Sequence, residues 1–582
     1  MSNSVFQFNF EHDQQQTENQ YPINDVQWIY VNDINSNNYG NGYINFTNVS
    51  IIGSSVEKQY DWSQAYLAIP YTVTVVPDGT LLTVAPDPVN VNALSIKSNA
   101  CLIDWCSVKF NGVSVNRGSY YNHLMMNERI KMYSNDKFDL YGDILNHVFD
   151  SGNTIGYNSL AGEYNNVTNL AAGLVAQGSK PGTVPNLAHR ARCAKTNVDL
   201  TNQANSTLGN FLLSTANAGV QSSTQSTVLL ANQNQNSLVY QSAAGLVYQG
   251  LSIIPLSELG CDFFKNMPSV ASSSGFELRL QMNLSKENSY QIRYALFASN
   301  TTVPNLVTSN QIVGHACPFM LANPSTDGST GFKTAGTSVL NGTMTVRACI
   351  GWDNQTGQLK TEFPGTSSNP CRIFIPAVSY TNEYIKNIVQ NPQYSLKYMD
   401  YYVDSDLNKQ QGSSISRLFN VQLSRVRNLY IIPFLSSPTG AFPSPTNSPI
   451  SSAPNTCSVA KLKNLNIQIG GQNIFTESQN FDYQFYNNNS LSLMSEINGN
   501  SLKSHFFSGQ ISKSQWSNGG YGVYCINLQK CADEVQDSLM KSFQLIFQIE
   551  GAAGLSYDFY YMITYQSELF LDRSTGTITN GF

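Results

Sequence analysis

Histidine and cysteine are the residue types in this chain best suited to bind a metal. The six histidines are scattered, and no HExxH motif places two of them on one face of a helix. The ten cysteines include no CxxC pair, and neighbours such as Cys101 and Cys106 lie five positions apart on a strand-like segment. We therefore expect no metal site and ten free thiols. The histidines are His12, His123, His147, His189, His315 and His505.

Carboxylates at Asp404 and Asp406 start a segment, DSDLN, that resembles the beginning of a calcium loop. The sixth and twelfth positions of such a loop require Gly and Glu, and this chain has Lys409 and Ile415 there. The Gly-rich run at Gly519 predicts a turn rather than a phosphate-binding loop, and no GxSxG elbow occurs. The sequence thus predicts no enzyme, with no catalytic, cofactor-binding or metal-binding residues and no cofactor.

Positive charge gathers in two short clusters, at residues 189–195 and 425–427. The net charge is −6 and only 12% of residues are charged, which argues against a surface built to neutralise phosphates. We expect no tight direct contact with nucleic acid, and we interpret the clusters as solvated loops or subunit contacts. Apolar runs such as LYIIPFL are far shorter than the roughly 20 residues of a membrane span, and no signal peptide is expected.

The rest of the composition favours an all-β protein. Tyr and Phe are abundant, at 32 and 29 residues, and Asn, Gln, Ser and Thr supply most of the polar surface. Aromatic and β-branched residues suit pleated, half-buried surfaces, and Asn, Gly and Ser suit the turns between strands. The hydrophobic share of 41% is enough to bury sizeable cores.

Several strand-like phrases occur twice and in the same order. AYLAIPY at Ala65 to Tyr71 resembles NLYIIPF at Asn428 to Phe434. A two-residue turn follows each, at Asn111-Gly112 and at Gly470-Gly471, between alternating apolar strands, as in tight hairpins. The order of the echoes predicts a duplicated domain.

The later echoes extend this pattern. FELRLQMNL from Phe276 matches FQLIFQIEG from Phe543, and in both the apolar residues alternate as in a half-buried strand. SYQIRYALF from Ser289 is matched to SYDFYYMIT from Ser556, and LSIIPLSEL from Leu251 to VYCINLQKC. We therefore expect two related β domains in tandem.

The two halves differ in length. The first half carries about 87 extra residues, mainly in the Asn-, Gln- and Ser-rich stretch 151–236, whose composition predicts surface loops. Helices are few: residues 119–149 have apolar residues at three- and four-residue steps, and 479–497 are a weaker match at the corresponding place.

With these strands, hairpins and the segment CRIFIPAVSYTNEYIKNIVQNPQYSLKYMDYYVD from Cys371 to Asp404, the chain resembles the double jelly-roll major capsid proteins of virophages and polinton-like viruses. The resemblance implies two eight-stranded antiparallel jelly-roll sandwiches and homotrimeric capsomers of nearly hexagonal outline in an icosahedral shell. It also implies assembly in the infected host cell, with neighbouring capsomers, penton and minor capsid proteins as partners. The expected division is a flexible N-terminal arm at 1–22, a first jelly roll at 23–300 with an insertion at about 151–250, a connecting segment at 301–370 and a second jelly roll at 371–582.

Two other function classes remain open. A tandem β-sandwich of a viral spike or lectin that binds host glycans is the main alternative, and an enzyme on a β scaffold is a distant third. A glycan-binding face would cluster tryptophans with Asp and Asn, whereas the five tryptophans of this chain are spread along the sequence.

The cysteine spacing leads to a redox prediction. Because free thiols impose no cross-link on the unfolded chain, adding a reductant should leave the melting temperature nearly unchanged. Thermal melts with and without dithiothreitol test this, and a large drop with reductant would reveal a disulfide framework.

Overall fold

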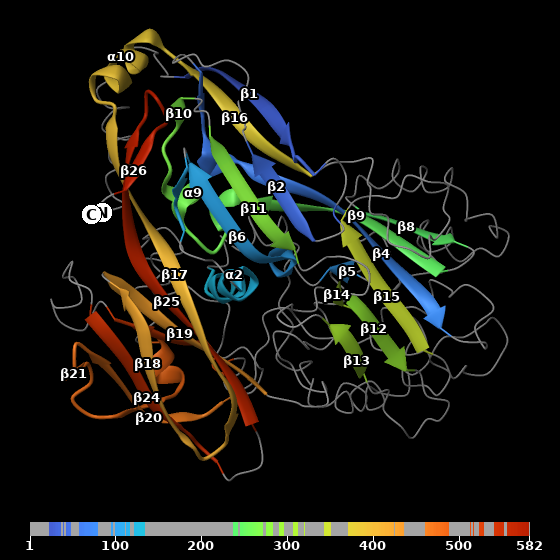
Figure 1. Ribbon diagram of the computed structural model, residues 1–582, viewed down its shortest axis with the longest axis vertical. Coiled ribbons are helices and arrows are strands. Elements are labelled where there is room, and N and C mark those ends of the chain that lie inside the picture. Colours follow the sequence, from blue (N-terminus) through green and yellow to red (C-terminus); the bar gives the residue numbers. More distant parts are fainter. Residues whose placement is uncertain are drawn as a thin grey trace.

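The computed structural model describes residues 23–78, 95–133, 237–320, 343–350, 371–435, 460–487, 513, 516, 523–528 and 541–580, with shorter gaps inside the longer ranges. These residues form antiparallel sheets arranged as two β-sandwiches with a contact between them (Figure 1). The expected arm at 1–22, the loops at 151–236 and the basic cluster at 189–195 lie outside the described residues.

The first sandwich pairs two four-stranded layers. One layer has the order β1 (Ile23–Asn32), β16 (Arg372–Tyr380), β4 (Tyr66–Asp78) and β9 (Gly245–Pro255). The facing layer has the order β2 (Tyr43–Thr47), β11 (Phe276–Met282), β6 (Ile103–Phe110) and β7 (Val113–Ser114).

The second sandwich repeats this order. One layer is β17 (Gln393–Gln410), β25 (Ser556–Asp572), β19 (Val426–Leu435) and β23 (Tyr524–Asn527). The other is β18 (Ser414–Leu423), β24 (Lys541–Ile549), β20 (Leu462–Ile469) and β21 (Gln472–Asn473). In both sandwiches the first, eighth, third and sixth strands face the second, seventh, fourth and fifth, so each is a jelly roll and the predicted double jelly-roll fold class is confirmed.

Further short elements decorate this frame. The first sandwich's sheet is extended by β3 (Lys58–Tyr60), β10 (Val270–Ala271), β15 (Thr343–Ile350), β12 (Tyr290–Ala295), β13 (Leu306–Gln311) and β8 (Ser237–Ser242). β5 (Ser95–Ile96) pairs with β14 (Phe319–Met320), and β22 (Gln479–Phe481) and β26 (Ile578–Asn580) add to the second sandwich. The helices are η1 (Trp62–Gln64), η2 (Asn99–Leu102), α2 (Asn122–Lys131), η4 (Leu256–Glu258), α9 (Phe263–Asn266) and α10 (Asn382–Gln390).

The seventh strands, β11 and β24, carry the core of each sandwich. Phe276, Leu278 and Leu280 on β11 are buried. Leu278 lies opposite Phe46 on one neighbour and Val108 on the other, so an apolar row crosses three strands. On β24 the corresponding buried residues are Phe543, Leu545, Phe547 and Ile549, which confirms the predicted alternation.

The two predicted hairpins are present. Phe110 pairs with Val113 around Asn111-Gly112, and Ile469 pairs with Gln472 around Gly470-Gly471. Gly112 has φ +80° and Gly471 has φ +84°, values in the left-handed region that glycine adopts without a steric cost.

The closing strand of the first sandwich is not the one that the echoes predicted. The matched segment from Ser289 contains β12, which pairs with β13 and β15 at the far end of the sheet. β16 instead takes the position between β1 and β4 that β25 takes between β17 and β19. The strand Arg372–Tyr380 therefore belongs to the first sandwich, although the sequence division at residue 371 assigned it to the second.

The match of AYLAIPY with NLYIIPF identifies the corresponding strands, β4 and β19, but aligns their residues one position out of register. Leu256 N donates to Ala65 O over 2.8 Å, and its counterpart Leu528 N donates to Arg427 O over 2.9 Å. Ala65 thus corresponds to Arg427, not to Asn428 as the matching letters suggested. A shift of one residue exchanges the two faces of a strand, so matching letters did not identify matching side chains.

The predicted helical insertion is helical in the part of it that the structure describes. α2 covers ten residues of the predicted 119–149 range, and positions 134–149 lie outside the described residues. Residues 483–487 are helical at the corresponding place of the second sandwich. Of the ten cysteines, Cys106, Cys261, Cys371 and Cys525 are buried free thiols, in agreement with the spacing argument.

The core assignment predicts a large difference between neighbouring positions of β24. Leu545→Asp places a carboxylate where no water reaches and should lower the free energy of unfolding by about 4 kcal/mol or more. Gln544 is on the opposite face, where its amide donates to Ser416 Oγ over 2.8 Å, so Gln544→Asp should change the stability by less than about 1 kcal/mol. Urea unfolding of both variants measures this, and equal losses would contradict the strand's orientation.

Candidate functional site: the contact between the sandwiches

The helix α2 lies between the two sandwiches. It follows the β6–β7 hairpin of the first sandwich and faces β17, β25 and β19 of the second (Figure 1). Tyr121, at its N-terminal boundary, has φ +54°, and Met132 follows the last helical residue, Lys131. All ten of its residues are buried, including six that carry ionisable or amide groups. A helix buried on every side has no solvent face, so each polar side chain needs a protein partner.

Asn122, the first residue of α2, links three elements. Its Oδ1 accepts a hydrogen bond from Gly260 N over 2.9 Å and lies 3.5 Å from the Tyr401 hydroxyl of β17. A Cβ at position 260 would lie 2.8 Å from both Asn122 Oδ1 and the Tyr401 ring. Glycine is therefore required here because the backbone approaches two buried side chains closely.

Arg129 makes the principal charged contact of α2. Its Nη2 lies 2.6 Å from Asp262 Oδ1, and its Nη1 donates to Leu259 O over 2.8 Å. Burial alone would lower the pKa of the Arg129 guanidinium, but the Asp262 and Glu258 carboxylates outweigh that effect and raise the pKa above its usual value. The arginine thus stays charged in a buried position and ties the helix to the segment that contains η4 and α9.

Two further polar pairs lie beside this ion pair. The Tyr133 hydroxyl donates to a Glu258 carboxylate oxygen, and burial raises the pKa of Tyr133 well above its usual value. Lys131 Nζ lies 2.5 Å from Glu128 Oε1. Burial raises the pKa of Glu128, and Lys131 partly opposes that shift.

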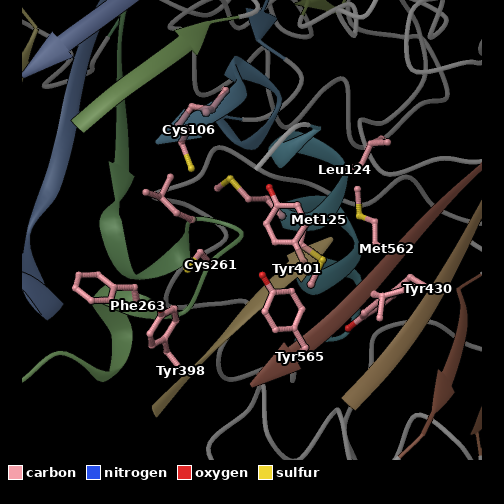
Figure 2. Close-up of a cluster of buried hydrophobic side chains, with 14 of the residues drawn as sticks. Cys106, Leu124, Met125, Cys261, Phe263, Tyr398, Tyr401, Tyr430, Met562 and Tyr565 are labelled. Atoms are coloured by element: carbon pink, nitrogen blue, oxygen red, sulfur yellow. The ribbon is translucent and has the colours of Figure 1, made fainter. Parts of the chain in front are cut away.

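Aromatic side chains of the second sandwich complete the contact. The Tyr398 ring packs edge-to-face on Phe263 with centroids 5.4 Å apart, and its hydroxyl donates to Val115 O over 2.5 Å. Figure 2 shows this pair together with Tyr401, Tyr430 and Tyr565 around the end of α2. The two sandwiches therefore share one continuous apolar core rather than meeting across a wet interface.

The cavity at this contact is small. It has a volume of about 30 Å³ and is lined by Met125, Arg129, Asp262, Met399 and Tyr430, among others. That volume holds about two water molecules, whereas small-molecule sites occupy about 300–1,000 Å³. The arrangement can hold two domains in a fixed orientation and has no room for a sugar or a nucleotide.

The acidic residues of the calcium-like segment have a different partner. Asp404 and Asp406 lie on β17, not in a loop, and Arg417 on β18 binds both, with N–O distances of 2.6 and 3.3 Å. The hydrogen bonds with Asp404 raise the pKa of Arg417. The three side chains join the two layers of the second sandwich.

The other described residues that the sequence analysis considered as ligands or binding residues contact side chains of this chain. His123 is buried with its Nδ1 3.4 Å from Asp104 Oδ1. Arg425 pairs with Glu568 over 2.7 Å, and Arg427 donates to Gln566. Within the described part of the chain, no three His, Cys, Asp or Glu side chains are grouped as metal ligands, and no described helix is long and apolar enough to cross a membrane.

Comparison with known proteins finds likeness in structure only. No family model matches the sequence, and no curated protein matches it. The chain is similar to one solved in the Sputnik virophage by cryo-electron microscopy, with TM-score 0.49 and 12% identity over 97% of this chain and 91% of that chain. It is similar to the mavirus major capsid protein, with TM-score 0.45 and 11% identity over 98% and 93%. A third likeness is to the Faustovirus major capsid protein, with TM-score 0.43 and 9% identity over 96% and 92%.

The class of protein follows from the strand pairing of this chain itself. Two jelly rolls with the same strand order, joined by a buried contact, define a tandem or double jelly-roll protein. The cavity at the contact of the two jelly rolls is too small for a sugar or a nucleotide.

The buried ion pair gives the prediction for this contact. Asp262→Ala leaves the Arg129 charge buried without its carboxylate and should cost about 3–5 kcal/mol of unfolding free energy. The double variant Arg129→Met, Asp262→Leu removes both charges and should recover most of that loss.

A more exposed pair in the same region serves as the control. Lys397 and Glu568 lie 3.8 Å apart with 47% of the lysine side chain exposed, so Lys397→Ala should cost less than about 1 kcal/mol. Chemical unfolding measures all three variants. If Asp262→Ala were as mild as Lys397→Ala, the contact would not depend on this pair.

Proposed function

We propose that this chain is a major capsid protein, the structural subunit of an icosahedral virus shell. The observation that carries the proposal is the duplicated jelly roll with its two copies fixed to each other by a buried contact. A closed ring of three such chains contains six similar sandwiches, so it fills a six-fold position of a shell with three subunits.

Several features of the chain support this role. The inter-sandwich contact is mostly apolar and continuous with both cores, so the subunit behaves as one rigid block. A rigid block keeps its shape when it packs against copies of itself. The low charge content of 12% suits a protein whose lateral faces are covered, because charged residues are depleted in the cores of large interfaces.

The proposal includes the expected partners and location. The homotrimer is the capsomer, its neighbours in the shell are other capsomers, and penton and minor capsid proteins complete the vertices and joints. The protein would be located in the virion capsid after assembly in the infected host cell. The proposed role requires no catalysis.

The test is the mass and shape of the purified protein. Mass photometry should give a species of about 193 kDa, three times the 64.2 kDa chain, and negative-stain electron microscopy should show particles of nearly hexagonal outline. A stable 64.2 kDa monomer at micromolar concentration would contradict the proposal. Monomers that bind a glycan array would favour the lectin-like alternative instead.

A further inference from the structure

The outer face of the first sandwich's β1–β16–β4 layer is apolar and is exposed at its β1 edge. On the edge strand β1, Val26, Trp28 and Tyr30 keep 47%, 50% and 57% of their surface exposed. Trp28 contacts Tyr66 of β4 at a centroid distance of 5.6 Å, and the Tyr66 ring stacks on Phe374 of β16 at 5.0 Å. We call these five residues the aromatic face.

The aromatic face is not an unfilled part of the core. Ile373 and Ile375 on β16 alternate with Phe374 and are fully buried on the inner side. Arg372 lies over the Tyr30 ring at 4.8 Å and marks one border of the face. The sheet is therefore apolar on both sides, which in a protein of low charge indicates a surface that another molecule covers.

The corresponding face of the second sandwich is already covered. In its central part the outward side chains Tyr430 on β19 and Tyr560 and Met562 on β25 are buried. The Tyr560 ring packs on Tyr121 of the first sandwich at 5.1 Å. Figure 2 shows Tyr430 and Met562 beside Leu124, which lies on α2.

The covering element has a counterpart in the second sandwich. α2 follows the β6–β7 hairpin, and the helical residues 483–487 follow the β20–β21 hairpin. Tyr483 and Phe485 in that segment are only partly buried, and Phe475 beside them is in ring contact with Phe485 at 5.8 Å. The second sandwich thus carries partly exposed apolar side chains at the position that corresponds to α2 in the first sandwich.

We propose that the aromatic face binds the second sandwich of another copy of this chain, through the segment that contains Phe475, Tyr483 and Phe485. The contact repeats between chains the contact that α2 makes within one chain. This contact joins different surfaces of the two copies. Such a contact can be repeated from copy to copy, and it forms a closed ring of three chains when the rotation between neighbouring copies brings the third chain back to the first.

The size of the aromatic face suits such a contact. A fully buried aromatic side chain contributes about 150–250 Å², and about half of Trp28 and Tyr30 is still exposed, while Tyr66 and Phe374 are partly buried. The aromatic face therefore forms one part of the about 800 Å² per partner that a stable interface needs. This inference rests on the proposed function, since it names the surface by which the trimer forms.

The test places charge on the aromatic face. The double variant Trp28→Glu, Tyr30→Glu should lose the 193 kDa trimer at micromolar concentration and give a folded 64.2 kDa monomer, because both carboxylates would have to be desolvated at the interface. The matched control is Leu418→Glu, at a residue 53% exposed on β18, which should leave the trimer intact. Mass photometry and circular dichroism measure assembly and folding.

The outcomes separate the two ideas. A wild-type chain that is monomeric defeats the proposed function and this inference together. A trimeric wild type whose double variant stays trimeric defeats only the inference, and the trimer would then form through another surface.

A cross-link identifies the occupant without charging the face. The photoreactive residue p-benzoylphenylalanine in place of Trp28, in the full chain, should give a covalent dimer on irradiation, with the linked peptide within residues 472–487. Links to residues 1–22 of the same chain, or to the first sandwich of another copy, would overturn the inference. This measurement also decides the matter if the double variant fails to fold.

Discussion

The buried pair of Arg129 and Asp262 holds α2 on the segment of the first sandwich that contacts the second sandwich. α2 carries the arginine into a buried position, and a charge in that position is tolerated only with its carboxylate in direct contact. Asp262 N in turn donates to Met399 O of β17 over 2.9 Å, so the same residue joins the helix to the second sandwich. The relative orientation of the two jelly rolls follows from these few directional contacts, while the apolar packing around them supplies most of the stabilisation.

The two copies of the jelly roll differ in the layer through which they meet. In the second sandwich the central parts of β19 and β25, in the layer that faces α2, are buried on both sides. β17 and β25 extend well beyond the facing layer to reach α9 and β10 of the first sandwich (Figure 1). In the first sandwich the same layer has solvent on one side and long additions at its end, where β12, β13 and β15 lengthen the sheet along β4. The two copies of the duplicated jelly roll thus have different roles: the first sandwich supplies the helix α2, and the second sandwich is covered by it.

The sequence allowed the fold class and the central strands to be predicted because those depend on local patterns. Alternation over Phe276 to Met282 specifies a strand with one buried face, and a glycine at residue 112 specifies its hairpin. The position of β16 depends on pairing between residues more than 300 positions apart, which no local pattern records. Similarly, α2 was recognised as a helix, but its burial was not, because burial of polar residues such as Asn122 and Arg129 depends on partners supplied by Gly260 and Asp262 in a distant segment.

The aromatic face was missed because Trp28 and Phe374 are neighbours only after β1 and β16 pair. The signal that could have indicated it is the sequence of β1, in which Trp28 and Tyr30 alternate with Ile29 and Val31. A strand with one face in solvent does not need apolar residues on both faces.

The late arrival of β16 bears on how the chain is made. In the described part of the chain, β1 forms its ladder with β16, from Ile23 with Tyr380 to Asn32 with Arg372. At a synthesis rate of about 5–20 residues per second, the first strand leaves the ribosome roughly 17–70 seconds before its partner exists. During that interval Trp28 and Tyr30 belong to an unpaired apolar strand, the kind of segment that associates with other nascent chains. A cell that produces this protein in quantity therefore needs a chaperone or a spacing of ribosomes that keeps these N-terminal strands apart until residue 380 has been added.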